Sequence, residues 1–393
     1  MAYFEKRGNK WYYTIDLGKD PVTGKRRQKR AVGGTTKKEA QAAAAAVMHE
    51  LAQGTHIKET DLLFPDFAQE WLQMYQDTTS VKKGTVRIRQ HEINLLSQYF
   101  RHAKVKDITK KAYQHVLNDL KKREYAHNTI SGAHSTGRMI FAKAMEFDMI
   151  KADPTQYAKV PRVQKTVKEL EEEHEIPKYL EKEELSQFLR AARECGLEYD
   201  YTTFLTLAYS GMRAGELCAL KWRDIDFEQH TISITKTYYN PSNNATQFEL
   251  VTPKTKKSKR TIEMEPIVLN ELEKHRASQR VFKMSMRNQY HDDDFVFTMT
   301  GKHPGYPIFI KTIENRMARL LKLSKLNEDL TPHSLRHTHT SLLAEAGVPL
   351  EDIMDRLGHQ DDLTTKNVYL HVTKTRKKEA SKKFGELMGN TSF

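Results

Sequence analysis

The stretch of residues 331–369 constrains this chain more than any other part of its sequence. It begins T-P-H-S-L-R-H, in which the threonine can cap a helix and the proline fits the first helical position. His333 and Arg336 are three residues apart, so they share one face of that helix. Gly347 predicts the end of the helix, because glycine readily adopts the left-handed conformation found there. A second short helix is expected to end at L-G-H, and a third to carry Tyr369.

Each polar residue of this stretch also has an ordinary interpretation. A histidine on a helix is more often solvated or packed than catalytic, and a tyrosine late in a chain usually packs in a core. The ordered set H-x-x-R, then L-G-H with His359, then Tyr369 favours a functional site instead. Two imidazoles, a guanidinium and a phenol suit an anionic phosphate better than a metal ion, because zinc sites need His, Cys or carboxylate ligands at tighter spacing. We therefore expect a phosphate-binding site without a metal.

The charge of the chain indicates a polyanionic partner. Its 393 residues suffice for two or three domains, and 64 Lys and Arg against 51 Asp and Glu give a formal net charge of +13. Nucleic acid fits this charge better than a membrane surface does, although a merely basic soluble protein would have the same composition. The chain has no apolar run long enough to cross a membrane, and its N-terminus lacks the apolar core of a signal peptide. The two cysteines, Cys195 and Cys218, are expected to be buried thiols in a reducing cytoplasm rather than a disulfide.

Residues 1–57 are predicted to form a three-stranded sheet and one helix. The run W-Y-Y-T-I is typical of a strand, and D-P-V-T-G is typical of the turn to the next strand. Thr36 and Glu39 form a capping-box pattern at the start of an alanine-rich helix. Cations beside and along the last strand could contact DNA phosphates, or they could protect a solvated edge strand against aggregation. These DNA-binding candidates are Lys25, Arg26, Arg27, Lys29 and Arg30.

Residues 61–160 are predicted to form a helical domain, because apolar and aromatic residues recur there at helical spacing. One helix start carries several cations, and backbone N–H groups at such a position can also hold phosphate. A solvated helix end is the alternative interpretation. The candidates here are Lys82, Lys83, Arg87 and Arg89. Residues 161–177 are polar, include two prolines and turn acidic, which predicts an interdomain linker.

The last predicted domain spans residues 178–385 and is followed by a tail to residue 393. The sequence S-G-M-R-A-G-E places Arg213 at a turn between two helices, where Glu216 can orient its guanidinium. An ordinary buried salt bridge is the alternative role for this arginine. The choice depends on whether the guanidinium reaches the surface.

Two later segments, 248–252 and 260–264, are predicted to be strands joined as a hairpin. Lys254 lies at the root of this hairpin and several cations lie at its tip. A charged tip is usually only solvated, but a lysine at the root could donate a proton. The tip cations taken as DNA-binding candidates are Lys256 and Lys257.

With these residues in hand, the chain resembles the tyrosine recombinases, specifically the integrases of phages and conjugative transposons. The strongest matches are S-G-M-R-A-G-E-L-C-A-L-K-W-R-D-I-D, the P-K-T of the hairpin, H-S-L-R-H-T, L-G-H and the late tyrosine. The helical domain is similar to the core-binding, SAM-like domain of that family, and the N-terminal domain to its arm-type DNA-binding domain. The resemblance implies a multidomain α+β fold that is mainly helical with small β-sheets, and a mixed α/β catalytic domain.

The resemblance also implies the central chemistry. Tyr369 would be the nucleophile that attacks the scissile phosphate, leaving a 3′-phosphotyrosine link and a free 5′-hydroxyl. Arg213 and Arg336 would clamp the non-bridging oxygens. A free phenol has a pKa of about 10, so it needs a nearby base or a cationic field to attack. Two fixed guanidiniums match phosphate geometry and would stabilise the charge of the transition state.

Three further residues have implied roles. Lys254 would protonate the leaving 5′-oxygen, His333 would assist proton transfer at the tyrosine, and His359 would donate a hydrogen bond to the phosphate. The covalent intermediate conserves the energy of the phosphodiester, so rejoining needs no nucleotide. We accordingly expect no cofactor, and the sequence contains no P-loop and no EF-hand loop.

The implied function is site-specific recombination that integrates and excises a mobile element. Such exchange takes four strand cleavages, so a homotetramer would assemble on double-stranded DNA that carries core and arm attachment sites. The reaction would take place in the cytoplasm of a bacterial host cell. An excisionase and a host DNA-bending protein are candidate partners, and no membrane is expected. Two alternatives are a type IB topoisomerase, disfavoured by the separate basic N-terminal unit, and a non-catalytic DNA-binding regulator, disfavoured by the complete set of six catalytic residues.

Overall fold

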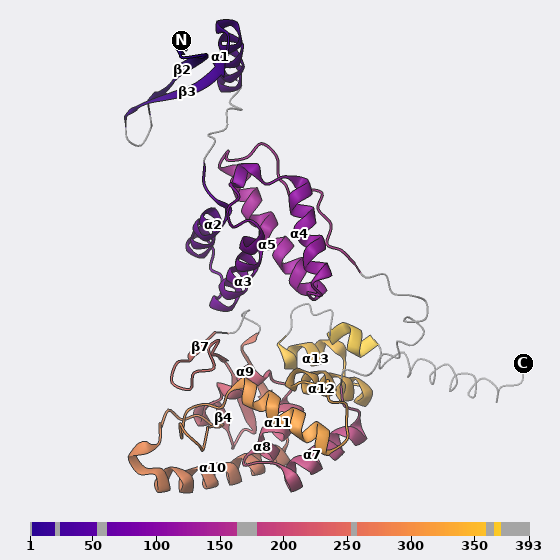
Figure 1. The fold of residues 1–393 in the computed structure, drawn as a ribbon. Helices are drawn as coiled ribbons and strands as arrows, with labels where there is room; N and C mark the ends of the chain where they lie inside the picture. Colours follow the sequence, from indigo (N-terminus) through magenta and orange to yellow (C-terminus); the bar gives the residue numbers. More distant parts are fainter. Residues whose placement is uncertain are drawn as a thin grey trace, which may run out of the picture. The chain divides into compact units, whose positions relative to one another are not determined.

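The computed structural model of the chain divides into two compact units, Met1–Lys168 and Glu169–Phe393 (Figure 1). Helices predominate and the sheets are small and antiparallel, which confirms the predicted fold class. The residues that the structure describes are 2–19, 24–52, 61–162, 179–252, 258–358 and 365–370.

The N-terminal sheet is antiparallel, in strand order β1-β2-β3, and one helix covers one of its faces. Tyr13 and Ile15 alternate along the middle strand and pack with Ala44 of the helix. The predicted capping box is confirmed, because the Glu39 amide donates to the Thr36 hydroxyl and the Glu39 carboxylate accepts from the Thr36 amide. The elements are β1 (Ala2–Arg7), β2 (Lys10–Lys19), β3 (Arg26–Gly34) and α1 (Lys37–Ala52).

Four α-helices follow in residues 61–162, and their apolar faces enclose one core. Phe64 is fully buried at its centre. Its ring stacks on Phe141, with 5.6 Å between centroids, and meets Phe100 edge-on at 5.4 Å. The helices are α2 (Phe64–Thr78), α3 (Lys83–Tyr99), α4 (Lys110–Lys122) and α5 (His127–Glu146).

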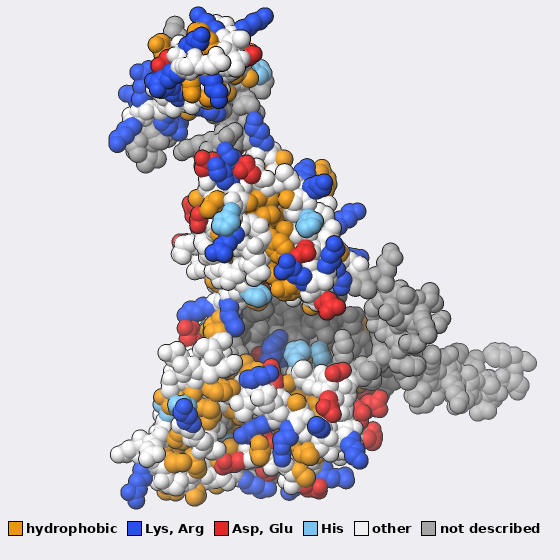
Figure 2. All heavy atoms as spheres, in the orientation of Figure 1, with side chains coloured by type: hydrophobic (Ala, Val, Ile, Leu, Met, Phe, Trp, Pro, Cys, Tyr) orange, Lys and Arg blue, Asp and Glu red, His pale blue; other side chains and the backbone are white. Residues whose placement is uncertain are grey.

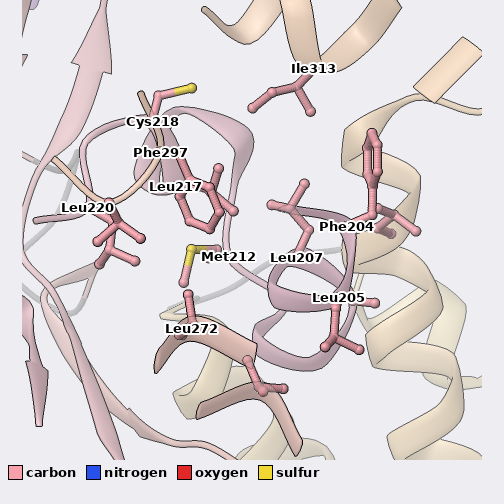
Figure 3. Packing of buried hydrophobic residues seen from close by; sticks show 14 of the residues in the cluster. Phe204, Leu205, Leu207, Met212, Leu217, Cys218, Leu220, Leu272, Phe297 and Ile313 are labelled. Carbon is pink, nitrogen blue, oxygen red and sulfur yellow. The ribbon is translucent and has the colours of Figure 1, made fainter. Parts of the chain in front are cut away.

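The second unit is built around α8, which is buried along most of its length and packs against α7, α10 and α12. Figure 3 shows Leu207 of this helix beside Met212 of the following turn and Leu217 of α9. The helices are α7 (Lys182–Cys195), α8 (Asp200–Ser210), α9 (Ala214–Cys218), α10 (Pro266–Met286), α11 (Ile310–Leu323), α12 (Pro332–Ala346) and α13 (Leu350–Leu357), followed by a short helix at residues 365–370.

The strands of the second unit pair differently from the predicted hairpin. In the described residues β7 pairs with β6 and β8 pairs with β5, so the two predicted hairpin strands do not pair with each other. Burial gives the physical reason, since Ile262 of β8 lies opposite Ile232 of β5 and both face the core. The strands are β4 (Ile225–Asp226), β5 (Thr231–Ile234), β6 (Thr237–Tyr239), β7 (Glu249–Val251) and β8 (Arg260–Glu263).

The two cysteines are free thiols in different environments. Cys218 is buried in α9, as predicted, and burial raises the pKa of its thiol. Cys195 is exposed at the end of α7, so the prediction of burial was wrong for it. Among the helices of the described part, none combines the length and the apolar character that a membrane crossing requires.

Candidate active site

Arg336 joins the two turns that precede other predicted site residues. It lies on α12 and is only 2% exposed. One terminal nitrogen, Nη1, donates to the carbonyl of Gly211 at 2.7 Å, and Nη2 donates to the carbonyl of Leu357 at 2.6 Å. Gly211 ends α8 two residues before Arg213, and Leu357 ends α13 two residues before His359. The sequence predicted a phosphate ligand here, and the structure shows a buried guanidinium that also holds these two turns together.

The turn at Gly211 requires glycine for two reasons. Its φ of +61° lies in the left-handed region. A Cβ atom there would also lie 2.7 Å from His339 and 2.8 Å from Leu357. The close approach of α12 and α13 to the end of α8 therefore depends on the absence of a side chain.

Arg213 begins α9 and is oriented by Glu216, as predicted. Its Nη1 lies 3.0 Å from the Glu216 Oε1, and its backbone N–H donates to Oε2 at 2.9 Å. The Arg213 side chain remains 39% exposed while that of Glu216 is 3% exposed. The guanidinium thus has an ion-pair partner and still reaches solvent, so the salt bridge and a surface role are compatible.

Glu216 is a buried carboxylate that stays charged. Burial raises its pKa, but the charge and hydrogen bonds of Arg260 and the proximity of Arg213 outweigh burial, so the pKa lies below its ordinary value. The carboxylate is therefore a fixed negative charge behind Arg213.

His333 lies on the first turn of α12 and is exposed. Its ring meets that of His337, one helical turn further on, edge to face with 4.8 Å between centroids. The helix starts as predicted, because Thr331 and Ser334 form reciprocal side-chain to backbone caps. This cap fixes the start of the helix that carries His333.

Tyr369 lies on the short helix at residues 365–370 and is half-buried. Its side chain packs against a small apolar cluster of Ala344, Ile353 and Leu357 from α12 and α13. The same Leu357 accepts the hydrogen bond from Arg336. The late tyrosine and the buried arginine are thus connected through one residue at the end of α13.

Four predicted site residues lie outside the described residues. They are Lys254, Lys256, Lys257 and His359. Their flanking elements are described, since β7 ends at Val251, β8 begins at Arg260 and α13 ends at Leu357. Within the described residues, no three or more His, Cys, Asp or Glu side chains lie together in a group that could hold a metal ion.

A second layer of polar residues, which we did not predict from the sequence, lies behind these arginines. The His339 Nδ1–H donates to the carbonyl of Ala208 at 2.9 Å, and its Nε2 accepts from Nε of Arg356 at 3.0 Å. Arg356 also donates to the carbonyls of Tyr209 and Glu263. Burial, and then the charge of Arg356, lowers the pKa of His339 to about 3, so this imidazole is neutral.

Arg260 belongs to the same layer. It shares the inward face of β8 with Ile262, and its side chain is 5% exposed. A cation on the apolar face of a strand usually has a buried partner. That alternation was a usable signal in the sequence, and it was missed.

The N-terminal DNA-binding candidates do not share one face. Along β3 the exposed Arg26 and Arg30 alternate with the half-buried Lys29. Arg26 pairs with Asp16 at 2.5 Å, and Arg30 pairs with Glu5 at 2.6 Å. The two-residue period of the strand therefore divides these cations between its two faces, and their contact with DNA stays a prediction. Lys25 and Arg27 are both exposed.

The candidates at the start of α3 separate in a similar way. Lys82 occupies the N-cap position and is half-buried, whereas Lys83 and Arg87 are exposed. Arg89 instead donates to the carboxylate of Glu92 at 2.9 Å and to the hydroxyl of Thr136 at 2.8 Å, across α3 and α5. This placement differs from the exposed position expected for a phosphate contact. Lys and Arg side chains (blue) remain spread over both units in Figure 2.

Comparison with known proteins matches three parts of the chain to family models. Residues 178–376 match the phage integrase family, which is 199 of the 393 residues. Residues 1–51 match an arm DNA-binding domain, and residues 63–121 match the N-terminal SAM-like domain of phage integrases.

Similar proteins extend over nearly the whole chain. A probable integrase of prophage ps2 from Lactococcus lactis is 28% identical over 392 residues, which cover 95% of this chain and 97% of that protein. The ICEBs1 integrase of Bacillus subtilis is 26% identical, covering 99% of this chain and 100% of that protein.

Two solved structures have a similar fold. The Tn1549 transposon integrase in complex with transposon right-end DNA has a TM-score of 0.64 at 19% identity, covering 80% of this chain and 99% of that one. A lambda integrase dimer bound to a core site has a TM-score of 0.57 at 16% identity, covering 93% and 94% of the two chains.

Proposed function

Because the chain belongs to the phage integrase family, we propose that it cleaves and rejoins DNA through a covalent bond between Tyr369 and a 3′-phosphate. The protein is a site-specific tyrosine recombinase. The observation that best supports the assignment of residues is the pair of bonds from Arg336 to Gly211 and Leu357, because it places the turns before Arg213 and His359 against one side chain.

In the proposed reaction, the phenolic oxygen of Tyr369 attacks the scissile phosphorus and the bond to the 5′-oxygen breaks. The phenol proton leaves to His333 or to solvent, and Lys254 supplies the proton that the 5′-oxygen takes up. The reverse attack by a 5′-hydroxyl of another strand restores the phosphodiester and frees the tyrosine. Each step exchanges one P–O bond for another, which is why nucleotide and metal are unnecessary.

Charge stabilisation is assigned to the two arginines. The guanidinium of Arg213 is fixed by Glu216 and reaches the surface, so it can bind a non-bridging phosphate oxygen. Arg336 uses one N–H of each terminal nitrogen on a carbonyl, and each of these nitrogens carries a second N–H. Groups held in this way need little reorganisation when charge develops in the transition state.

The three predicted domains are assigned to three parts of the DNA substrate. Residues 1–57 would bind arm sites, residues 61–160 would bind the core site beside the crossover, and residues 178–385 would carry the chemistry, with 161–177 as the linker. The matches to an arm DNA-binding domain and a SAM-like domain support the first two assignments. A homologous fold has been solved as a lambda integrase tetramer bound to a Holliday junction, which supports a tetramer on DNA here.

The biological outcome proposed is integration and excision of a mobile element in the cytoplasm of a bacterial host. Relatives named as integrases of a prophage and of ICEBs1 support this setting. An excisionase and a host DNA-bending protein are proposed as partners that decide direction. Either one would act by changing the DNA path between arm and core sites.

The test uses a nicked duplex built from the DNA that flanks the gene, where we expect the attachment repeats. With chelator present, the wild-type protein should form a covalent adduct that survives a denaturing gel. Tyr369→Phe should form none and should bind the duplex with nearly unchanged affinity. A persistent adduct in Tyr369→Phe would remove this residue from the nucleophile's role, and no adduct with the wild type would contradict the proposed reaction.

A further inference from the structure

We infer that Arg260 is a positioning residue of the active site: it neutralises the buried Glu216 so that the charge of Arg213 remains available for phosphate. The inference deepens the proposed function and rests on it.

The contact between Arg260 and Glu216 is a buried fork. The two side chains are 5% and 3% exposed. Nη2 of Arg260 donates to Oε2 of Glu216 at 2.9 Å, and Nη1 approaches Oε1 at 3.4 Å. Two parallel N–H to oxygen contacts are the geometry in which arginine binds a carboxylate most firmly.

The same two oxygens also hold Arg213. Oε1 accepts from its Nη1 at 3.0 Å and Oε2 accepts from its backbone N–H at 2.9 Å. One carboxylate therefore lies between two guanidiniums, one of them buried and the other 39% exposed. Together, the side chains of Glu216, Arg213 and Arg260 carry a net charge of +1. Arg213 is the exposed member of the three.

Arg260 also reaches the end of α13. Its Nε donates to the carbonyl of Arg356 at 2.8 Å, and Nη1 lies 3.3 Å from the carbonyl of Ser258. Arg356 immediately precedes Leu357, which accepts from Arg336. One buried side chain at the start of β8 thus contacts Ser258, the first turn of α9 and the end of α13. In the sequence these three places are close to Lys254, Arg213 and His359.

The charge balance predicts what the loss of Arg260 would do. A buried carboxylate without its buried counterion is strongly unfavourable, so it must draw in another cation or take up a proton. The guanidinium of Arg213 already contacts Oε1, and its backbone N–H contacts Oε2, so Arg213 is placed to take over as the counterion. A guanidinium drawn inward as a counterion can no longer serve the phosphate, and cleavage should slow more than DNA binding weakens.

The test compares Arg260→Met with Arg316→Met. Arg316 of α11 pairs with the buried Asp200 at the opposite end of α8, so its loss also leaves a buried carboxylate, but away from the active site. Melting temperature, affinity for the nicked duplex and the single-turnover rate of adduct formation are measured for both. Arg260→Met should slow adduct formation on the order of 100-fold with affinity within about threefold, and Arg316→Met should change the rate less than about threefold.

Two further variants separate positioning from folding. Arg260→Lys keeps the charge but loses the fork, so it should recover about tenfold of the lost rate and should fold if the methionine variant does not. In an Arg213→Ala background, Arg260→Met should slow the reaction by no more than about threefold further, because the two residues act through one group.

The possible failures are distinguishable. A wild-type protein without an adduct would overturn the proposed function. A wild type with a normal adduct, and equal rates for Arg260→Met and Arg316→Met, would overturn only this inference. If the rate losses of Arg213→Ala and Arg260→Met multiply in the double variant, that result would also overturn only this inference.

Discussion

The half-buried Arg356 and the buried His339 form a side-chain pair in which the imidazole is the acceptor. The Arg356 Nε donates to the His339 Nε2 at 3.0 Å, and the other ring nitrogen donates to Ala208. A protonated imidazole could not accept this bond. The arrangement therefore fixes both the tautomer and the charge of a residue behind the active site.

This pair predicts how stability depends on pH. The pKa of His339 is lowered from 6.5 to about 3, so between these values the unfolded chain takes up a proton that the folded chain does not. The stabilisation from the neutral, buried His339 is fully present above pH 6.5, and it is lost progressively as the pH falls toward 3. Glutamine also offers a donor and an acceptor but does not titrate. The His339→Gln variant should therefore lack this pH-dependent loss of stability. Chemical denaturation at pH 7 and pH 4.5 should show a smaller fall for the variant, by roughly 1 kcal/mol or more. Equal falls would contradict the prediction.

A substitution of Gly211 should lower stability. Gly211→Ala forces an L side chain into the left-handed region and places Cβ 2.7 Å from His339. We expect the free energy of unfolding to drop by roughly 2–4 kcal/mol. Gly301→Ala is the matched control, because nothing lies within 4 Å of a Cβ there. Thermal unfolding of both variants checks the prediction, and similar melting temperatures would contradict it.

Two arginines on α3 should behave differently. Arg87 is exposed, so Arg87→Ala should weaken DNA binding and reduce the slope of log affinity against log salt by about 1. Arg89 pairs with Glu92 at 2.9 Å, so Arg89→Ala should lower stability on the order of 2 kcal/mol instead. Binding measured across salt concentrations, together with thermal unfolding, separates the two effects. A weaker salt slope for Arg89→Ala with unchanged stability would reverse these assignments.

Removal of residues 1–57 should separate cleavage from recombination. If this unit binds arm sites, the truncated protein should form the adduct on a core-site duplex at a rate within about threefold of wild type. Recombination between full attachment sites should fall by at least about tenfold. The contact with the arm site would no longer raise the effective concentration of the catalytic domain at the core site. Gel analysis of both reactions with one protein preparation is the measurement. Undiminished recombination would refute the arm-site assignment.

Local sequence was enough for everything that depends on short spacing. The bounds of α12 were predicted from the cap at Thr331 and the glycine after the helix. Its polar face was predicted from the three-residue interval between His333 and Arg336. Glu216 was paired correctly with Arg213 because they are one helical turn apart. Such features follow from backbone periodicity, and they needed no knowledge of distant contacts.

Tertiary packing decided the rest, because it brings together residues that no spacing connects. The partners of Arg336 are 125 and 21 residues away, and Arg260 meets Glu216 across 44 residues. The pairing of β8 with β5 instead of β7 followed from which apolar faces could be buried together. The sequence by itself therefore determined which chemical groups the site has and which helix face presents them. The fold alone determined which of those cations are buried as counterions and which remain exposed, since that depends on the charges and carbonyls that packing places beside each one.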